Sequence, residues 1–135
     1  MKILTKNSDY AIRALIALAE DSATFLSAKE IAQKQSIPYQ FLRRILQDLI
    51  KNDLIVSKEG GGGGFKILVD PKDVNVVDVI KIFQGGLQLS ECMFRDKLCR
   101  HRSNCSLRNE MKRVETVVEK EFSRITLQKL LRNSK

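Results

Sequence analysis

Hydrophobic residues recur through much of this chain at intervals of three and four positions, which is the spacing of one face of an α-helix. The stripe Ile12, Leu15, Ile16 and Ala19 predicts a helix over residues 9–20, with Asp9 in its first turn. The same spacing predicts two more helices, with the stripes Leu42, Ile45, Leu46, Leu49 and Val76, Val79, Ile80, Phe83. It also predicts one long final helix from residue 107 to residue 131, with the stripe Leu107, Met111, Val114, Val118, Phe122 and Ile125.

Residues that favour helix ends set the boundaries between these helices. Ser27 and Glu30 have the spacing of a capping box, which predicts a short helix that begins at residue 28 and ends near residue 35. Pro38 disfavours helical geometry in the residue before it and suits the first position of the next helix. Asn75 suits the start of the helix that follows, and the pair Gly85-Gly86 suits its end.

Two short strands are predicted between the third and fourth helices, at residues 54–57 and 65–69. The loop between them contains residues 60–64, which hold five of the seven glycines in the chain. A phosphate-binding P-loop needs Gly-Lys-Ser/Thr and a following helix, whereas here Phe65 and a strand follow, so we reject nucleotide binding. The order helix, turn, helix and hairpin predicts a mainly α fold with a small β-hairpin, the winged helix-turn-helix.

The third predicted helix is the candidate recognition helix for DNA. Its apolar stripe faces the core, which leaves Tyr39, Gln40 and Arg43 on the outer face, where Arg suits guanine edges and Gln suits adenine edges. The same pattern fits an ordinary three-helix core with a solvated face, but the glycine loop favours a wing that lies against phosphates or enters the minor groove. The predicted DNA-contacting residues are Ser27, Lys29, Pro38, Tyr39, Gln40, Arg43, Arg44, Lys58, Gly61 and Gly62.

The charge of the chain favours a polyanionic partner. Its formal net charge is +8, and residues 86–135 contribute +6 of it, which suits nucleic acid or an anionic membrane surface. The longest stretch without charge, residues 82–90, is nine residues, well short of the ~20 that a membrane helix needs. No secretory segment is predicted, so we expect a cytoplasmic protein with reduced thiols.

Three cysteines, Cys92, Cys99 and Cys105, are the candidate metal ligands. They lack the CxxC pair typical of zinc ribbons, and three thiolates leave one position of a tetrahedral metal or cluster open. Cationic neighbours, which stabilise thiolates, are Arg95, Lys97, Arg100, Arg102 and Arg108. The spacing is compatible with ligated thiols, a redox pair, or buried thiols without a ligand.

The sequence as a whole resembles the Rrf2 family of bacterial winged-helix regulators. Four places carry the resemblance over nearly the whole chain. They are Leu4-Thr5 with Asp9-Tyr10-Ala11 and Arg13, residues 37–46, residues 60–65 followed by Leu68, and the three cysteines after Gly85-Gly86.

The resemblance implies a cofactor and an assembly. The cysteines are similar to those of the family's iron–sulfur-cluster assembly regulator and nitric-oxide-sensing repressor, which implies that Cys92, Cys99 and Cys105 hold an iron–sulfur cluster, with 4Fe-4S favoured and 2Fe-2S possible. The resemblance further implies a homodimer through the last helix. Asp9 matches the position from which the partner subunit gives a fourth ligand in the nitric-oxide sensor, and His101 is the second choice.

Three positions depart from the family pattern. The first cysteine gap is one residue longer than usual, Arg108 stands where the assembly regulator has a histidine ligand, and Glu59 stands where the wing often has an arginine. The resemblance divides the chain into a DNA-binding domain at residues 1–86, a cysteine loop at 87–106, and a dimerisation helix and tail at 107–135.

The combined prediction is a homodimeric DNA-binding transcription regulator, either a repressor or an activator, whose affinity for its operator depends on an iron–sulfur cluster that senses nitric oxide, oxygen, redox state or iron–sulfur status. The alternative is a cluster-free regulator that uses its cysteines as a thiol switch or to bind zinc. A third possibility is an iron–sulfur carrier or a small redox enzyme. The basic recognition face and the glycine wing argue against a carrier, and a single histidine without a catalytic constellation argues against an enzyme.

Overall fold

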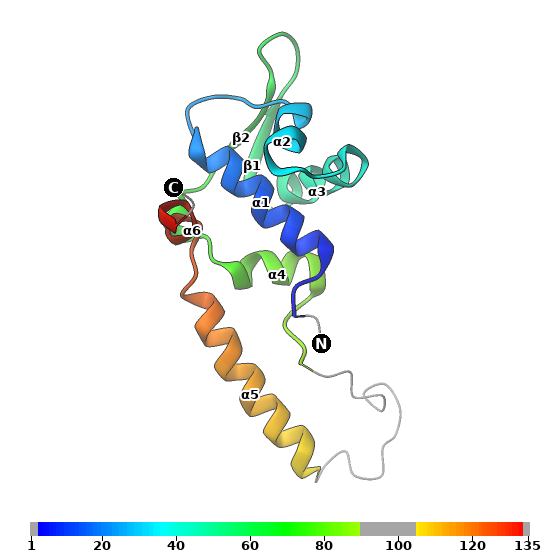
Figure 1. Ribbon diagram of the computed structural model, residues 1–135, viewed down its shortest axis with the longest axis vertical. Helices are drawn as coiled ribbons and strands as arrows, with labels where there is room; N and C mark the ends of the chain where they lie inside the picture. Colours follow the sequence, from blue (N-terminus) through cyan, green and yellow to red (C-terminus); the bar gives the residue numbers. More distant parts are fainter. Residues whose placement is uncertain (1–2, 90–104, 134–135) are drawn as a thin grey trace.

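A computed structural model describes residues 3–89 and 105–133 of the chain. In Figure 1, α1, α2, α3 and a hairpin form one end of the molecule, α4 and α6 lie next to α1, and α5 extends away from them. The elements, in chain order, are α1 (Lys6–Glu20), α2 (Ala28–Gln35), α3 (Tyr39–Lys51), β1 (Ile55–Lys58), β2 (Gly64–Ile67), the 3-10 turn η1 (Pro71–Asp73), α4 (Val76–Gln84), α5 (Ser106–Ser123) and α6 (Leu127–Asn133). The predicted mainly α fold with a small hairpin is therefore confirmed.

The hydrophobic core is built around α1, which contacts α2, α3, α4 and α6. Ala11, Ala14 and Ala17 on α1 are completely buried, and such small side chains let neighbouring helices approach closely. The stripe predicted for α3 is buried as expected, with Leu42, Ile45, Leu46 and Leu49 at most 2% exposed. Burial of this stripe fixes the rotation of α3 and leaves its polar face outside.

Two helix starts differ from the predicted ones. The first helix begins at Lys6 rather than Asp9, because Thr5 caps it by accepting a hydrogen bond from the backbone N–H of Ser8 (3.3 Å). Pro38 is the N-cap of α3 rather than its first helical residue. The predicted capping box of α2 is confirmed, with Ser27 and Glu30 bonded to each other's backbone N–H groups.

The predicted single final helix is wrong, because the chain breaks between α5 and α6. The Val76 N–H donates to the Ile125 carbonyl (2.9 Å), and the Leu127 N–H donates to the Val74 carbonyl (2.9 Å). These two bonds hold the break against the segment before α4, and they let Leu127, 2% exposed, enter the core. A straight helix could not make these backbone bonds, since its own N–H and carbonyl groups would be paired internally.

The hairpin is antiparallel, with Ile55 opposite Ile67 and Lys58 opposite Gly64. Leu26 pairs with Phe65 on the other side of β2, with backbone N to O distances of 2.9 and 2.7 Å. No pattern in the sequence predicts this one-residue bridge. Gly64 has φ +142°, and a Cβ there would collide with the Leu26 carbonyl oxygen, so the close approach requires glycine.

In the part of the chain that the structure describes, no helix combines the length and the apolar character needed to cross a membrane.

Candidate DNA-binding surface and cysteine site

The outer face of α3 has the composition of a DNA-reading surface. Its exposed side chains are Tyr39, Gln40, Arg43, Arg44 and Gln47. The guanidinium carbon of Arg43 lies 6.0 Å from the centre of the Tyr39 ring, within reach of a cation–π contact. All four residues predicted from this helix are therefore exposed together on one face, and Gln47 extends that face beyond the predicted set.

An open groove of about 350 Å³ joins α3 to the wing. It is lined by Ser27, Ala28, Tyr39, Arg43, Gln47, Lys58, Gly60, Gly63, Gly64 and Phe65. The groove thus brings together four of the predicted residues. They are Ser27 before α2, Tyr39 and Arg43 on α3, and Lys58 on β1. Phe65, which the sequence placed in the second strand of the hairpin, was not among the predicted DNA-contacting residues but lines the groove.

The remaining predicted DNA-contacting residues lie around this groove rather than in it. Gly61 and Gly62 are exposed in the loop between β1 and β2, and a Cβ at either would meet no other atom within 4 Å. Lys29 is exposed in the first turn of α2, and Pro38 is exposed where α3 begins. The wing tip is therefore bare backbone that can approach a phosphate closely.

Of the predicted cluster ligands, only Cys105 and Asp9 lie in the described residues; Cys92, Cys99 and His101 lie outside them. Cys105 is the N-cap of α5, partly exposed, and its Sγ accepts a hydrogen bond from the backbone N–H of Arg108 (3.4 Å). Within the two described stretches, no three His, Cys, Asp or Glu side chains could together hold a metal ion.

Asp9 lies in the first turn of α1 and is bonded locally. Its carboxylate oxygen is 3.2 Å from Nε of Arg13, and both side chains are about half exposed. In Figure 1 the first turn of α1 and the start of α5 lie apart in the same chain. One chain therefore does not bring Asp9 and Cys105 together.

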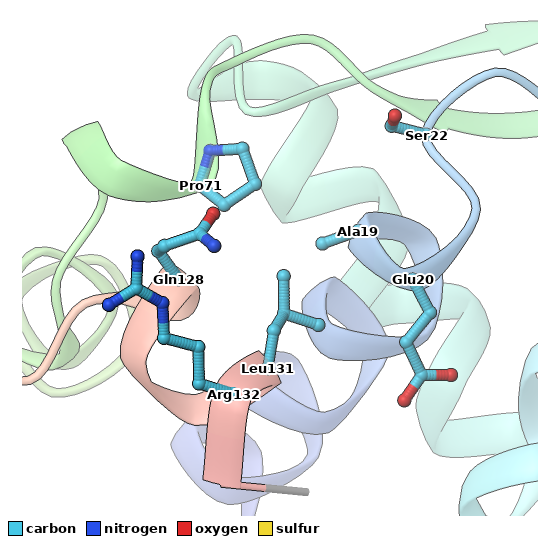
Figure 2. A pocket seen from close by; sticks show the side chains of 7 residues that line it. All are labelled: Ala19, Glu20, Ser22, Pro71, Gln128, Leu131 and Arg132. Atoms are coloured by element: carbon cyan, nitrogen blue, oxygen red, sulfur yellow. The ribbon is translucent and has the colours of Figure 1, made fainter. Parts of the chain in front are cut away.

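A second cavity of about 770 Å³ lies between the end of α1, η1 and α6. Its two charged side chains, Glu20 and Arg132, point away from each other in Figure 2, while Gln128 is directed toward Pro71. A binding or catalytic pocket usually directs its polar groups toward a common point. We therefore assign no ligand to this cavity.

Comparisons with known proteins agree with the fold. The family model described as "Rrf2: Iron-dependent Transcriptional regulator" matches residues 4–133. NsrR of Bacillus subtilis (strain 168), an HTH-type transcriptional regulator, is 29% identical over 132 residues, which is 96% of this chain and 90% of that protein.

Two solved structures share the fold. CymR, described as the global cysteine regulator of B. subtilis, has a TM-score of 0.81 and 21% identity, with 98% of each chain covered. IscR of T. potens has a TM-score of 0.80 and 23% identity, with 100% of this chain and 89% of that chain covered. The resemblance found in the sequence is confirmed, as is the expectation that the protein is not an enzyme. The chain belongs to the Rrf2 family of winged-helix transcription regulators.

Proposed function

We propose that this regulator binds a DNA operator as a homodimer and that an iron–sulfur cluster controls its affinity for the operator. The observation that carries the DNA-binding part is the groove where the exposed face of α3 meets the glycine wing. A helix of this kind enters the major groove, and a side-chain-free loop beside it lies on the backbone.

Within this surface we assign two kinds of contact. Gln40 and Arg43 contact base edges, because they are exposed on the turns of α3 that begin the helix. Lys58 and the glycines at 61–62 contact the sugar–phosphate backbone, which carries no sequence information.

A comparison of two variants tests this assignment. The experiment selects an operator from random duplexes and then measures binding to the operator and to a scrambled duplex at several salt concentrations. Arg43→Ala should cost roughly 1–3 kcal/mol on the operator and much less on scrambled DNA. Lys58→Ala should weaken binding to both duplexes by the same factor. It should also lower the slope of log affinity against log salt concentration by about one unit, because one phosphate is no longer neutralised. Equal losses on both duplexes for Arg43→Ala would refute base recognition by α3.

The homodimer is supported by the uncovered apolar side chains of α5. Leu107 is 71% exposed, Val117 is 53% exposed and Val114 is 36% exposed. A second copy of the same helix would cover them, and the two-fold axis would present two copies of α3 to the DNA. The operator should therefore be a pseudo-palindrome, with half-sites about one turn of DNA apart or a multiple of that.

The cluster is assigned to Cys92, Cys99 and Cys105, with Asp9 of a second subunit as the fourth ligand. Two observations support the fit. Cys105 is partly exposed, and a backbone N–H already donates to its sulfur, an interaction that tunes thiolate ligands of clusters. Asp9 is half exposed and lies away from Cys105 in its own chain, which suits a ligand given across a dimer. When bound, the cluster would supply a group that reacts with oxygen or nitric oxide.

Anaerobic purification tests the cofactor. We expect coloured protein that contains iron and inorganic sulfide, and Cys105→Ala should lose the colour while Ser106→Ala, the adjacent exposed residue, should keep it. Colourless protein with stoichiometric zinc, or with neither metal, would instead favour the cluster-free regulator. That second candidate has one specific support, because Cys105 is a partly exposed free thiol that an oxidant could reach.

A further inference from the structure

Cation–π contacts occur on α3 and on elements that contact it. Four such contacts occur among the described residues: Lys6 over Phe41 (5.8 Å), Arg43 over Tyr39 (6.0 Å), Lys58 over Phe25 (5.7 Å) and Lys66 over Phe25 (5.7 Å). Their residues belong to the first turn of α1, to α3, to the hairpin and to the segment that pairs with it. Two of these cations, Lys6 and Lys66, were not among the residues predicted to contact DNA.

The pairing of the wing explains how Phe25 meets two lysines. Because Leu26 is bonded to Phe65, Phe25 lies next to Lys66 on the outer face of the sheet. Val56 of β1 lies opposite Lys66, and Lys58, two residues further along β1, is on the same face. Two ammonium groups, that of Lys58 on β1 and that of Lys66 on β2, thus each lie 5.7 Å from the centre of the Phe25 ring. Phe25 itself is partly buried.

Phe41 holds a third lysine where α3 begins. Phe41 is 48% exposed, and its ring lies 6.4 Å from the ring of Tyr10 and 5.8 Å from the ammonium nitrogen of Lys6. Both α1 and β1 contact α3. In Figure 1 the hairpin and the first turn of α1 are separated in space, so the two aromatic platforms adjoin α3 at different places.

None of these three lysines forms an ion pair with a carboxylate in the described part of the chain. This distinguishes them from Lys72 and Lys81, which do. A carboxylate partner would neutralise a lysine and repel phosphate, whereas an aromatic face restrains the side chain and keeps its charge. Restraint before binding also reduces the side-chain entropy that is lost on binding.

We propose that Phe25 and Phe41 are positioning residues whose rings hold Lys66, Lys58 and Lys6 for contact with DNA phosphates on either side of the groove that α3 enters. The inference rests on the proposed function, because it takes α3 as the recognition helix. It extends the contact surface to two lysines, Lys6 and Lys66, and gives the two phenylalanines a role that their partial exposure alone does not explain.

The first test removes the charges one at a time. Lys66→Ala and Lys6→Ala should each weaken binding to the operator and to scrambled DNA by the same factor, and should each lower the salt slope by about one unit for every phosphate left unneutralised. Lys129→Ala, which removes an exposed lysine from α6, is the control for net charge and should leave the slope unchanged. An unchanged slope for both Lys66→Ala and Lys6→Ala would overturn the proposal.

The second test is a double-mutant cycle that separates positioning from mere packing. Phe25→Ala should weaken DNA binding about two- to fivefold, the usual size of an exposed cation–π contact, and Phe25→Leu should not restore it. In the Phe25→Ala background, removal of Lys66 should have a smaller effect than in the wild type. If Phe25 only supports the fold, the two effects will simply multiply, and thermal unfolding will report the lost packing.

The two proposals fail in different ways. If the wild type binds its operator and Arg43→Ala loses sequence preference, while the lysine and phenylalanine variants leave the slopes unchanged and the cycle shows independent effects, only the aromatic platforms are refuted. If Arg43→Ala weakens operator and scrambled DNA alike, the recognition role of α3 itself is refuted.

Discussion

The helices α3 and α5 are both amphipathic, yet a single chain buries the apolar face of α3 only. On α3, which has 13 residues, the four residues of the apolar stripe are at most 2% exposed. On α5, which has 18 residues, none of the residues is buried within the described chain. Phe122, near its end, packs against the core, whereas Leu107 and Val117 stand more than half exposed.

This difference shows which surface each helix offers to a partner. The apolar side of α3 is satisfied inside the chain, so its free surface is polar and suits DNA. On α5, by contrast, the apolar side chains of Leu107, Val114 and Val117 remain exposed, which suits contact with a protein surface. Most of the stability of a helix in a protein comes from the packing of its apolar face, so α5 should depend on a partner for much of its stability. The predictions that follow test that contrast, beginning with the largest effect.

Deleting a buried side chain from α3 should have the largest effect. Leu46 is completely buried, so Leu46→Ala should lower the free energy of unfolding by about 2–5 kcal/mol, through lost burial and a cavity. The loss, measured by urea denaturation, should be similar at all protein concentrations. Leu107→Ala on α5 removes the same atoms from a 71% exposed site, and its smaller loss should depend on protein concentration. Equal, concentration-independent losses would contradict the comparison.

A charge in the apolar stripe of α5 should separate the subunits without unfolding them. Val114 lies at the centre of that stripe, so Val114→Asp would place two carboxylates in the dimer interface. We expect the dimer dissociation constant to rise by roughly thirtyfold, or about 2 kcal/mol, in sedimentation equilibrium. Thr116→Asp, on the opposite side of the helix, is the matched control and should leave the dimer intact. Unchanged association of the Val114 variant would show that α5 is not the interface.

Removing the hydrogen bonds between the end of α4 and the start of α1 should lower the free energy of unfolding by an intermediate amount. The side-chain oxygen of Gln84 accepts bonds from the Ser8 hydroxyl (2.7 Å) and the Thr5 N–H (3.0 Å), and its amide donates to the Ile3 carbonyl (3.0 Å). Ser8 is completely buried, so Gln84→Ala would leave its hydroxyl with one bond fewer. The free energy of unfolding should fall by about 1–2 kcal/mol, with faster amide exchange in the first turn of α1.

An exposed glutamine on α2 provides the control for that variant. Gln33→Ala also replaces a helical glutamine, but its side chain is exposed, so its effect should stay within about 0.5 kcal/mol. A loss for Gln84→Ala no larger than for Gln33→Ala would show that the three bonds contribute little to stability.

The sequence predicts elements whose signals are local. The stripes of α1, α3 and α4 each combine a helical period with a residue that favours a helix start, and the run of glycines at residues 60–64 marks the wing. The break after Ser123 could not be predicted this way, because no glycine or proline lies there and the break depends on backbone bonds to Val74 and Val76, far away in the chain. The bridge at Leu26 could not be predicted for the same reason.

In the candidate site, too, the residues with local signals could be predicted and those that depend on distant contacts could not. The polar face of α3 follows directly from its buried stripe, so Gln40 and Arg43 could be assigned to it from spacing alone. The aromatic platforms could not be, because Phe25 meets Lys66 only through the pairing of Leu26 with Phe65. A ligand set that includes Asp9 and Cys105 depends on how two chains assemble, which no pattern within one chain encodes.

The smallest effect on stability is expected at Asp9, and its smallness makes the test specific. Thr5, not Asp9, caps α1, and the Asp9–Arg13 ion pair is half exposed. Asp9→Ala should therefore lower the free energy of unfolding of the cluster-free protein by only about 0.5 kcal/mol. Arg13→Ala breaks the same ion pair from the other side and is the matched control. If Asp9 is a ligand, its loss should bleach the anaerobic protein while Arg13→Ala and His101→Ala keep the colour. Bleaching by Arg13→Ala as readily as by Asp9→Ala would mean that Asp9 acts through the helix rather than on the cluster, and bleaching by His101→Ala alone would transfer the fourth position to the histidine.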